Sequence, residues 1–146
     1  MDLNDILAQW GEDCEIGHNL DEASRDTPKL HAKYLGYHIQ TKLLLKRAEE
    51  KQQILLKNKF LWYNGKLSQE EVSALGWNPD PFDGLKIMKG DLSYYYDSDP
   101  EIQQSEAKVV YFKTMLEALK EIIDTLKWRH QTIGNSIRWK QFEAGA

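Results

Sequence analysis

Residues 99–143 read DPEIQQSEAKVVYFKTMLEALKEIIDTLKWRHQTIGNSIRWKQFE, and this stretch decides the fold. Asp99-Pro100-Glu101 predicts a helix start, because aspartate caps free amides and proline fits the first turn. Apolar residues then recur at alternating spacings of three and four for about five heptads, which indicates one long amphipathic helix. This apolar seam is formed by Ile102, Ser105, Val109, Phe112, Leu116, Leu119, Ile123, Leu126, His130, Ile133 and Ile137. Such a seam predicts a coiled-coil or helical-barrel interface, an antiparallel hairpin within the chain, or both.

A second long helix is predicted over residues 28–63. Asp26 or Thr27 can cap it, Pro28 fits its first turn, and Asn64-Gly65 supplies the stop. Its seam has the same heptad spacing and consists of Leu30, Tyr34, Tyr37, Thr41, Leu44, Ala48, Lys51, Leu55, Asn58 and Trp62. Because the seam becomes polar at Lys51 and Asn58, we expect tight packing in its first half and looser packing towards its end.

The N-terminal segment predicts a short amphipathic helix at residues 2–10, ended by Gly11. Residues 12–26 are polar, and we expect them to be irregular, with a short extended piece at residues 14–16. The sequence here therefore predicts a small element that adds to the two long helices.

The segment between the two long helices begins with Ser68-Gln69-Glu70-Glu71, a capping box that predicts a short helix ended by Gly76. Residues 78–84 contain two prolines and predict a loop. Residues 85–98 are ambiguous, although their three consecutive tyrosines favour an extended segment.

Together these elements predict a mainly α-helical protein whose long amphipathic helices assemble into a ring-like homo-oligomer. The 146 residues suit one domain. We divide it into residues 1–66, an acidic N-terminal helix plus a long basic helix; residues 67–98, an acidic connector; and residues 99–146, a C-terminal oligomerisation helix. Self-association follows from two helices of about 50 Å that have too few partners in one short chain.

The composition narrows the class of protein. Cys14 is the only cysteine, so no intrachain disulfide and no cysteine-rich metal site is expected. The acidic start does not resemble a secretory leader, and no apolar run approaches the roughly 20 residues that span a bilayer. We therefore expect a soluble, intracellular protein without membrane contact.

Charge alternates in blocks along the chain. Residues 1–26, 27–66, 67–107 and 108–146 carry net charges of −7, +7, −7 and +3, which agree with the overall charge of −4. The basic block predicts a polyanionic partner. The acidic blocks should repel that partner or pair with basic faces of neighbouring subunits.

The strongest functional signal is the basic-aromatic segment, residues 57–66, with the sequence KNKFLWYNGK. Lysines can neutralise phosphates and aromatic rings can stack on unpaired bases, as a sequence-tolerant single-strand binder requires. We predict phosphate contacts from Lys57, Lys59 and Lys66, with a solvated helix face as the alternative for each.

Aromatic residues of the same segment differ in their expected roles. Tyr63 lies off the seam and is the better stacking candidate, whereas Trp62 lies on the seam, where core packing is an equal alternative. Phe60 and Leu61 are expected to pack.

Further cations precede this segment on the same predicted helix. Lys42, Lys46 and Arg47 share roughly one side and can extend the nucleic-acid track, although a solvated face or intersubunit ion pairs explain them equally well. A second basic-aromatic cluster is interpreted mainly as packing or subunit interface, with a second strand contact as the alternative; it consists of Trp128, Arg129, Trp139 and Lys140.

The C-terminal pattern of Arg129, Ile133 and Ile137 followed by Phe142-x-x-Gly145 resembles the UvsY family of phage recombination mediators. Lys57-Asn58-Lys59-Phe60 is similar to that family's short Lys-x-Arg-Leu motif. Lysine stands where the family has arginine, which keeps a phosphate contact but loses bidentate geometry. Residues 67–84 resemble an insertion relative to the shortest members.

The resemblance implies a non-enzymatic protein that acts in the cytoplasm of an infected bacterium. It would bind single-stranded DNA as a ring, a hexamer or heptamer. It would help displace the phage single-strand-binding protein and load the UvsX-like phage recombinase, in recombination, repair and replication. The resemblance also associates the C-terminal region with oligomerisation, which selects Phe112, Leu116, Leu119, Ile123, Leu126, Ile133, Ile137 and Phe142.

No catalytic or cofactor motif was found in the sequence. A nucleotide phosphate loop is missing, no nucleophile has a recognisable setting, and the acidic run that begins at Asp97 lacks the glycine and final acid of a calcium loop. We therefore expect no cofactor and no metal. The main rival is a coiled-coil scaffold without nucleic-acid binding, and an ATP-using recombination enzyme is a third, weaker interpretation.

Overall fold

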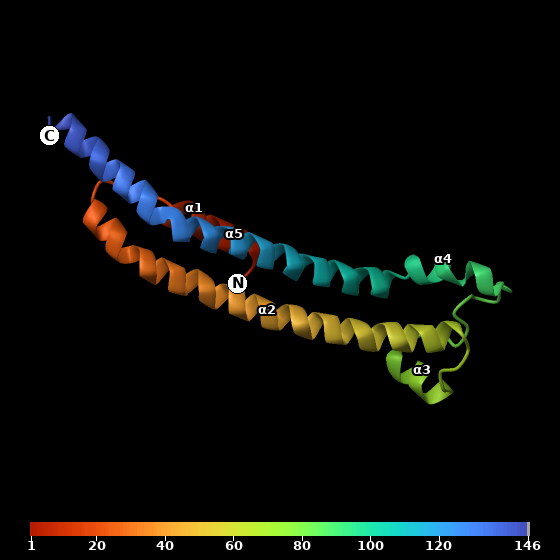
Figure 1. The fold of residues 1–146 in the computed structure, drawn as a ribbon. Coiled ribbons are helices and arrows are strands. Elements are labelled where there is room, and N and C mark those ends of the chain that lie inside the picture. The colour runs from red at the N-terminus through yellow and green to blue at the C-terminus, as the bar shows by residue number, and fades with distance from the viewer. Residues whose placement is uncertain (146) are drawn as a thin grey trace. The chain divides into compact units, whose positions relative to one another are not determined.

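The computed structural model describes residues 1–145 and shows a chain built from helices, with no strand in that part of the chain. Its elements in chain order are α1 Leu3–Asp13, α2 Leu20–Tyr63, α3 Gln69–Leu75, the 3-10 turn η1 Lys89–Asp91, α4 Leu92–Asp97 and α5 Pro100–Glu143 (Figure 1). The predicted mainly α-helical class is thereby confirmed, including both long helices.

The chain forms two compact units. Unit 1 consists of Met1–Leu43 together with the chain from Phe112 onwards, and unit 2 is Leu44–Tyr111. Helices α2 and α5 each contribute to both units. The prediction that the chain is a single domain stays a prediction.

Helix α1 begins and ends differently from the sequence prediction. The Asp2 carboxylate accepts the Asp5 amide at 2.8 Å and so caps the first turn. The helix runs through Gly11 to Asp13, so the prediction that Gly11 ends it is wrong. The turn beyond Gly11 is held by Asp13, whose carboxylate accepts Lys33 and Tyr34 and whose backbone oxygen accepts Arg129.

Helix α2 starts at Leu20, eight residues before the predicted start, so the expectation of an irregular stretch up to residue 26 is wrong for its last part. The physical reason is Asn19, whose side chain accepts the Glu22 amide at 3.1 Å and caps the helix. Pro28 therefore lies inside the helix. At the other end Gly65 has φ 69°, the left-handed turn predicted for Asn64-Gly65.

Unit 1 contains a continuous apolar core to which α1, α2 and α5 all contribute. Its buried members are Ile6, Tyr34, Met115, Leu119, Ile122, Ile123 and Leu126. Trp10 packs edge-to-face on Tyr34 at 5.5 Å between ring centroids. The buried face of α5 includes Met115 and Ile122, which lie one position before the predicted Leu116 and Ile123. The face is wider than a coiled-coil seam because α1 as well as α2 covers it.

Unit 2 buries fewer apolar side chains, namely Ala48, Tyr63, Val72, Ile102 and Val109. Helix α3 begins as predicted, because Ser68 accepts the Glu71 amide at 3.2 Å, and ends at Gly76 with φ 71°.

The tyrosines of residues 94–96 lie in helix α4, so the expectation of an extended segment there is wrong. A strand needs a partner for its backbone hydrogen bonds, and residues 1–145 offer none. The loop at residues 78–84 is confirmed. There the Asp80 carboxylate accepts the amides of Phe82 at 3.0 Å and Gly84 at 2.6 Å.

Candidate nucleic-acid interface

The basic-aromatic segment divides between two faces at the end of α2. Lys59 and Tyr63 point into unit 2 and are buried, whereas Lys57 and Phe60 are exposed. Lys59 and Tyr63 are four apart on the helix and share one face, whereas Lys57 and Phe60 are three apart and share another, which explains this division. The segment thus has an inner, structural side and an outer side that solvent reaches.

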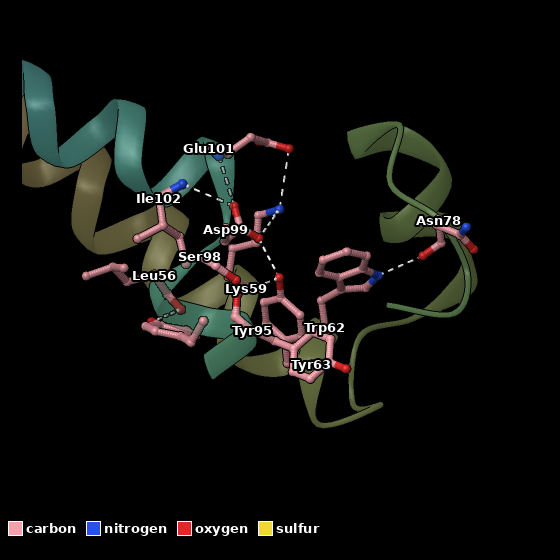
Figure 2. A network of polar contacts seen from close by, with 11 residues as sticks. Leu56, Lys59, Trp62, Tyr63, Asn78, Tyr95, Ser98, Asp99, Glu101 and Ile102 are labelled. Carbon is pink, nitrogen blue, oxygen red and sulfur yellow. Dashed lines mark hydrogen bonds and ion pairs between the residues drawn. The ribbon is translucent and has the colours of Figure 1, made fainter. Parts of the chain in front are cut away.

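Lys59 occupies a closed box of acidic and aromatic groups (Figure 2). Its ammonium lies 3.0 Å from Asp99 Oδ2 and 3.4 Å from Glu101 Oε1. The same ammonium lies 4.1 Å from the ring centroid of Trp77 and 4.6 Å from that of Trp62. The side chain is only 3% exposed. No polar group of Lys59 is therefore directed towards solvent.

Tyr63 completes the box from the next turn of α2. Its hydroxyl donates to Asp99 Oδ2 at 2.7 Å, and its ring packs at 5.8 Å from Phe82. Burial and the neighbouring Asp99 carboxylate raise the pKa of this phenol well above its ordinary value. The Tyr63 hydroxyl thus remains a hydrogen-bond donor at every physiological pH.

Asp99 connects the box to α5. Its Oδ1 accepts the backbone amides of Glu101 at 2.9 Å and Ile102 at 3.1 Å, which confirms the predicted cap. Burial alone would raise the pKa of this carboxyl. The hydrogen bonds from Tyr63 and Lys59, together with the Lys59 charge, outweigh burial and lower it. Asp99 is therefore an ionised carboxylate that serves α2 and α5 at once.

The structure does not favour direct stacking on Trp62 or Tyr63. Tyr63 is buried, and half-buried Trp62 donates from Nε1 to the Asn78 carbonyl at 2.8 Å and packs at 5.2 Å from Trp77. Stacking on these rings, and a phosphate contact from Lys59, stay predictions that require the box to open.

Phe60 was expected to pack, but its side chain is 53% exposed, so that expectation is wrong within the chain. It shares an outer face of α2 with Lys46, Gln53 and Lys57, at helical spacings of seven, four and three. Lys46 lies 4.0 Å from Glu50, a weak exposed pair. This outer face presents cations and an open aromatic ring together.

Other predicted cations are also exposed. Lys66 follows the end of α2 and Arg47 lies beside the outer face, both in unit 2. Lys42 is exposed in unit 1. No acidic residue occurs between Glu50 and Glu70, so this part of unit 2 is locally basic.

The residues predicted for oligomerisation fall into two groups. Leu119, Ile123 and Leu126 belong to the core of unit 1. Ile133 is also buried, and Phe112 and Leu116 are half-buried. Ile137 and Phe142 are exposed, the latter at 69%. The C-terminal group is thus the part of this set that is most exposed in the protomer, and the role of all these residues in oligomerisation stays a prediction.

Sequence reasoning missed the structural roles of several residues, in the box around Lys59 and at the end of α1. Trp77 lines the box around Lys59 and carried no motif of its own, and Glu101 was predicted only as part of a helix start although it also pairs with Lys59. Arg129 is buried and donates to the backbone oxygens of Asp13 at 3.0 Å and Glu15 at 3.4 Å, so it secures the end of α1. The signals for Arg129 were its place in the C-terminal pattern and in the second basic-aromatic cluster, and neither indicated this partner.

The described residues contain neither a metal-ligand cluster nor a membrane-spanning helix. Residues 1–145 contain no group of three or more metal-ligating side chains. None of the helices described there has the length and apolar character needed to cross a membrane.

Comparisons with known proteins give a consistent picture. Crystal structures of the bacteriophage T4 recombination mediator protein UvsY are similar to this chain. Lattice type II has a TM-score of 0.79 at 21% identity over 99% of this chain and 98% of that chain. Lattice type IV has a TM-score of 0.76 at 18% identity over 98% and 99%. At such identities the likeness establishes the fold. No curated protein sequence matches the chain significantly.

A family model settles the relationship at the sequence level. The model described as "Recombination, repair and ssDNA binding protein UvsY" matches residues 9–146, nearly the whole chain. The chain therefore belongs to the UvsY family of recombination, repair and single-stranded-DNA-binding proteins.

Proposed function

We propose that this protein is a recombination mediator that binds single-stranded DNA through the outer face of α2 in unit 2. The observation that carries the proposal is the exposure of Lys57 and Phe60 side by side, in a stretch without acidic residues. Lysine ammoniums neutralise phosphates, and an open aromatic ring accepts a base of any sequence. Lys46 and Lys66 extend this surface, and Arg47 and Lys42 supply further positive charge.

The proposed protein acts as a closed homo-oligomer, a ring of hexamer or heptamer size. Three large apolar side chains near the end of α5, Ile137, Trp139 and Phe142, are exposed. They support subunit contact, because burying their apolar surface against a neighbour would stabilise the oligomer. Trp139 and Phe142 already stack at 5.5 Å between ring centroids. A strand that crosses several subunits gains effective concentration at each one, so a modest patch per protomer suffices.

In the proposed mechanism the protein carries out no catalysis of its own. Many simultaneous phosphate contacts offset the contacts that the phage single-strand-binding protein loses when it is displaced. A UvsX-like recombinase then nucleates on the held strand. We place this activity in the cytoplasm of the infected bacterial host.

A salt-dependent titration tests the DNA-binding part. A fluorescent mixed-sequence oligonucleotide is titrated with Lys57→Met/Lys66→Met and with the control Lys86→Met/Lys89→Met, whose lysines are exposed elsewhere in unit 2. Each lost phosphate contact should reduce the slope of log K against log salt by about 0.7, so the first variant should lose about 1.4 and the control nothing. Equal slopes in both variants would contradict the assigned surface.

Recombinase loading needs its own measurement. Recombinase filament formation on strands covered by the single-strand-binding protein is followed with wild type, the same two variants and no mediator. We expect stimulation by wild type and the control only. A wild-type protein that is oligomeric by sedimentation but neither binds DNA nor stimulates loading would instead be a helical scaffold.

A further inference from the structure

We propose that Lys59 is a positioning residue of the nucleic-acid interface: it stays paired with Asp99 when a strand binds and holds the turn of α2 that presents Lys57 and Phe60. The inference rests on the proposed function, because it concerns how that interface is built. It gives the second lysine of the basic-aromatic segment a role different from that of the first.

The surroundings of Lys59 leave no donor for a phosphate. The Asp99 and Glu101 carboxylates lie 3.0 Å and 3.4 Å from its ammonium, and the Trp62 and Trp77 rings cover two further sides. These groups already satisfy a buried ammonium as acceptors and ring faces. A strand approaching the outer face of α2 meets Lys57 instead.

Releasing Lys59 would also strip Asp99 of the cation with which it is paired in the described residues. The Asp99 side chain is 2% exposed and caps α5 through the Glu101 and Ile102 amides. Removing one partner of a buried pair shifts the local equilibrium by a factor of about 100 or more. One phosphate contact on a single strand raises the binding constant only about fourfold at ~0.15 M salt, given a slope of about 0.7 per contact. Breaking the pair of Lys59 and Asp99 would therefore cost more free energy than one phosphate contact provides.

Fixing Lys59 in place also affects the outer face of α2. Lys57 and Phe60 are its neighbours within one turn, so a fixed inner side fixes the direction in which they point. The box also holds Trp62, whose indole donates to Asn78 in the chain that follows. Lys59 thus acts on the strand through the geometry of residues that touch it.

Lysine acetylation of the wild-type protein tests this without any variant. The protein is treated briefly with an amine-reactive reagent, free and with a saturating single-stranded oligonucleotide, and each lysine is quantified by mass spectrometry. Lys59 should react at least about tenfold more slowly than Lys57 in both states, since its reaction requires local opening. Lys57 and Lys66 should react readily when free and be protected by DNA, while Lys86 and Lys89 should not change.

Two outcomes would overturn the inference. Lys59 that reacts like Lys57 when free and is protected by DNA would be a direct contact, and Lys59 that becomes reactive on binding would be a released latch. If the oligonucleotide is not retained and Lys57 is not protected, the proposed function itself fails, which is a different pattern.

The salt dependence of binding gives a second test, because replacing a direct contact changes its slope and replacing a positioning residue does not. Lys57→Met should reduce the slope of log K against log salt by about 0.7. Lys59→Met should weaken binding at every salt concentration with the slope unchanged. A slope reduced equally in both variants, with helix content intact by circular dichroism, would also overturn the inference.

Discussion

Unit 1 buries Ile6, Tyr34, Met115 and a row of α5 side chains in one apolar core, whereas unit 2 buries few apolar residues and also buries the ion pair of Lys59 and Asp99. Apolar burial is non-directional and spread over many contacts, so the stability of unit 1 does not depend on the exact geometry of one pair of residues. A buried ion pair depends on both partners and on every hydrogen bond around them. The unit that carries the proposed interface is therefore the one whose structure rests on fewer groups.

Polar groups of unit 1 provide a second contrast. Asp13 accepts Lys33 Nζ at 2.6 Å and the Tyr34 hydroxyl at 2.8 Å, a lysine–tyrosine–aspartate set like that of unit 2. The Asp13 side chain is 25% exposed, however, so water can replace a lost partner. The same three residue types thus form a partly exposed set in unit 1 and a buried set in unit 2.

The largest effect is expected from Lys59→Met. It leaves the buried Asp99 carboxylate without a cation and should destabilise unit 2 by about 3–5 kcal/mol. Hydrogen exchange should show faster opening of amides in residues 44–111, with unit 1 less affected. Lys59→Met/Asp99→Asn should lose less than the sum of its single variants, and additive losses would contradict coupling between the two residues.

In unit 1, Leu119→Ala should cost about 2–5 kcal/mol, because Leu119 is fully buried and its removal leaves a cavity. Urea unfolding at fixed protomer concentration measures it, and amides of unit 1 should exchange faster. The matched control is Leu43→Ala in the same unit, which is 59% exposed and should change stability by no more than about 0.5 kcal/mol. A similar loss in both variants would refute the assigned core.

The contrast between the units also explains what the sequence predicted about the fold. Heptad spacing and capping residues identified both long helices, the Asp99 cap and the short helix after Ser68. The start of α2 was missed because Pro28 is an obvious first-turn residue, while Asn19 caps a less regular stretch. Most of the buried face of α5 was predicted, and Met115 was missed because α1 as well as α2 covers this face, which periodicity within one helix does not reveal.

The candidate site was less predictable than the fold. The segment at residues 57–66 was found from its composition, but the roles of its side chains depend on which face of α2 is covered. Lys59 is buried because Asp99, forty residues further along the chain, meets it, and no local pattern encodes that pairing. Phe60 is open because the same contacts turn it outward. Composition therefore located the segment that carries the proposed interface, and tertiary pairing determined which of its side chains are buried and which are exposed.

A finer comparison uses one matched change in each unit, Tyr63→Phe and Tyr34→Phe. Each removes a hydroxyl that donates to a carboxylate, at 2.7 Å to Asp99 and at 2.8 Å to Asp13. Tyr63→Phe should cost about 1.5–3 kcal/mol, as for a buried bond to a charged group, and Tyr34→Phe about 0.5–1.5 kcal/mol. Equal costs by urea unfolding would mean that the exposure of Asp13 makes no difference.

The smallest expected effect is a difference between Asp99 and Asp13 in how the stability that each contributes depends on pH. The hydrogen bonds and lysine charges around Asp99 and Asp13 outweigh burial and lower both pKa values. A carboxylate with a lowered folded pKa contributes stability that is complete above its unfolded value of about 3.9 and is lost as pH falls through the folded value. The difference in melting temperature between wild type and Asp99→Asn should therefore be constant from pH 7 to about 5 and narrow below about 4. Asp13→Asn should show the same narrowing on a smaller scale, because solvent screens its ion pair with Lys33. A difference that stayed constant below pH 4 would show that Asp99 acts through shape and not through its charge.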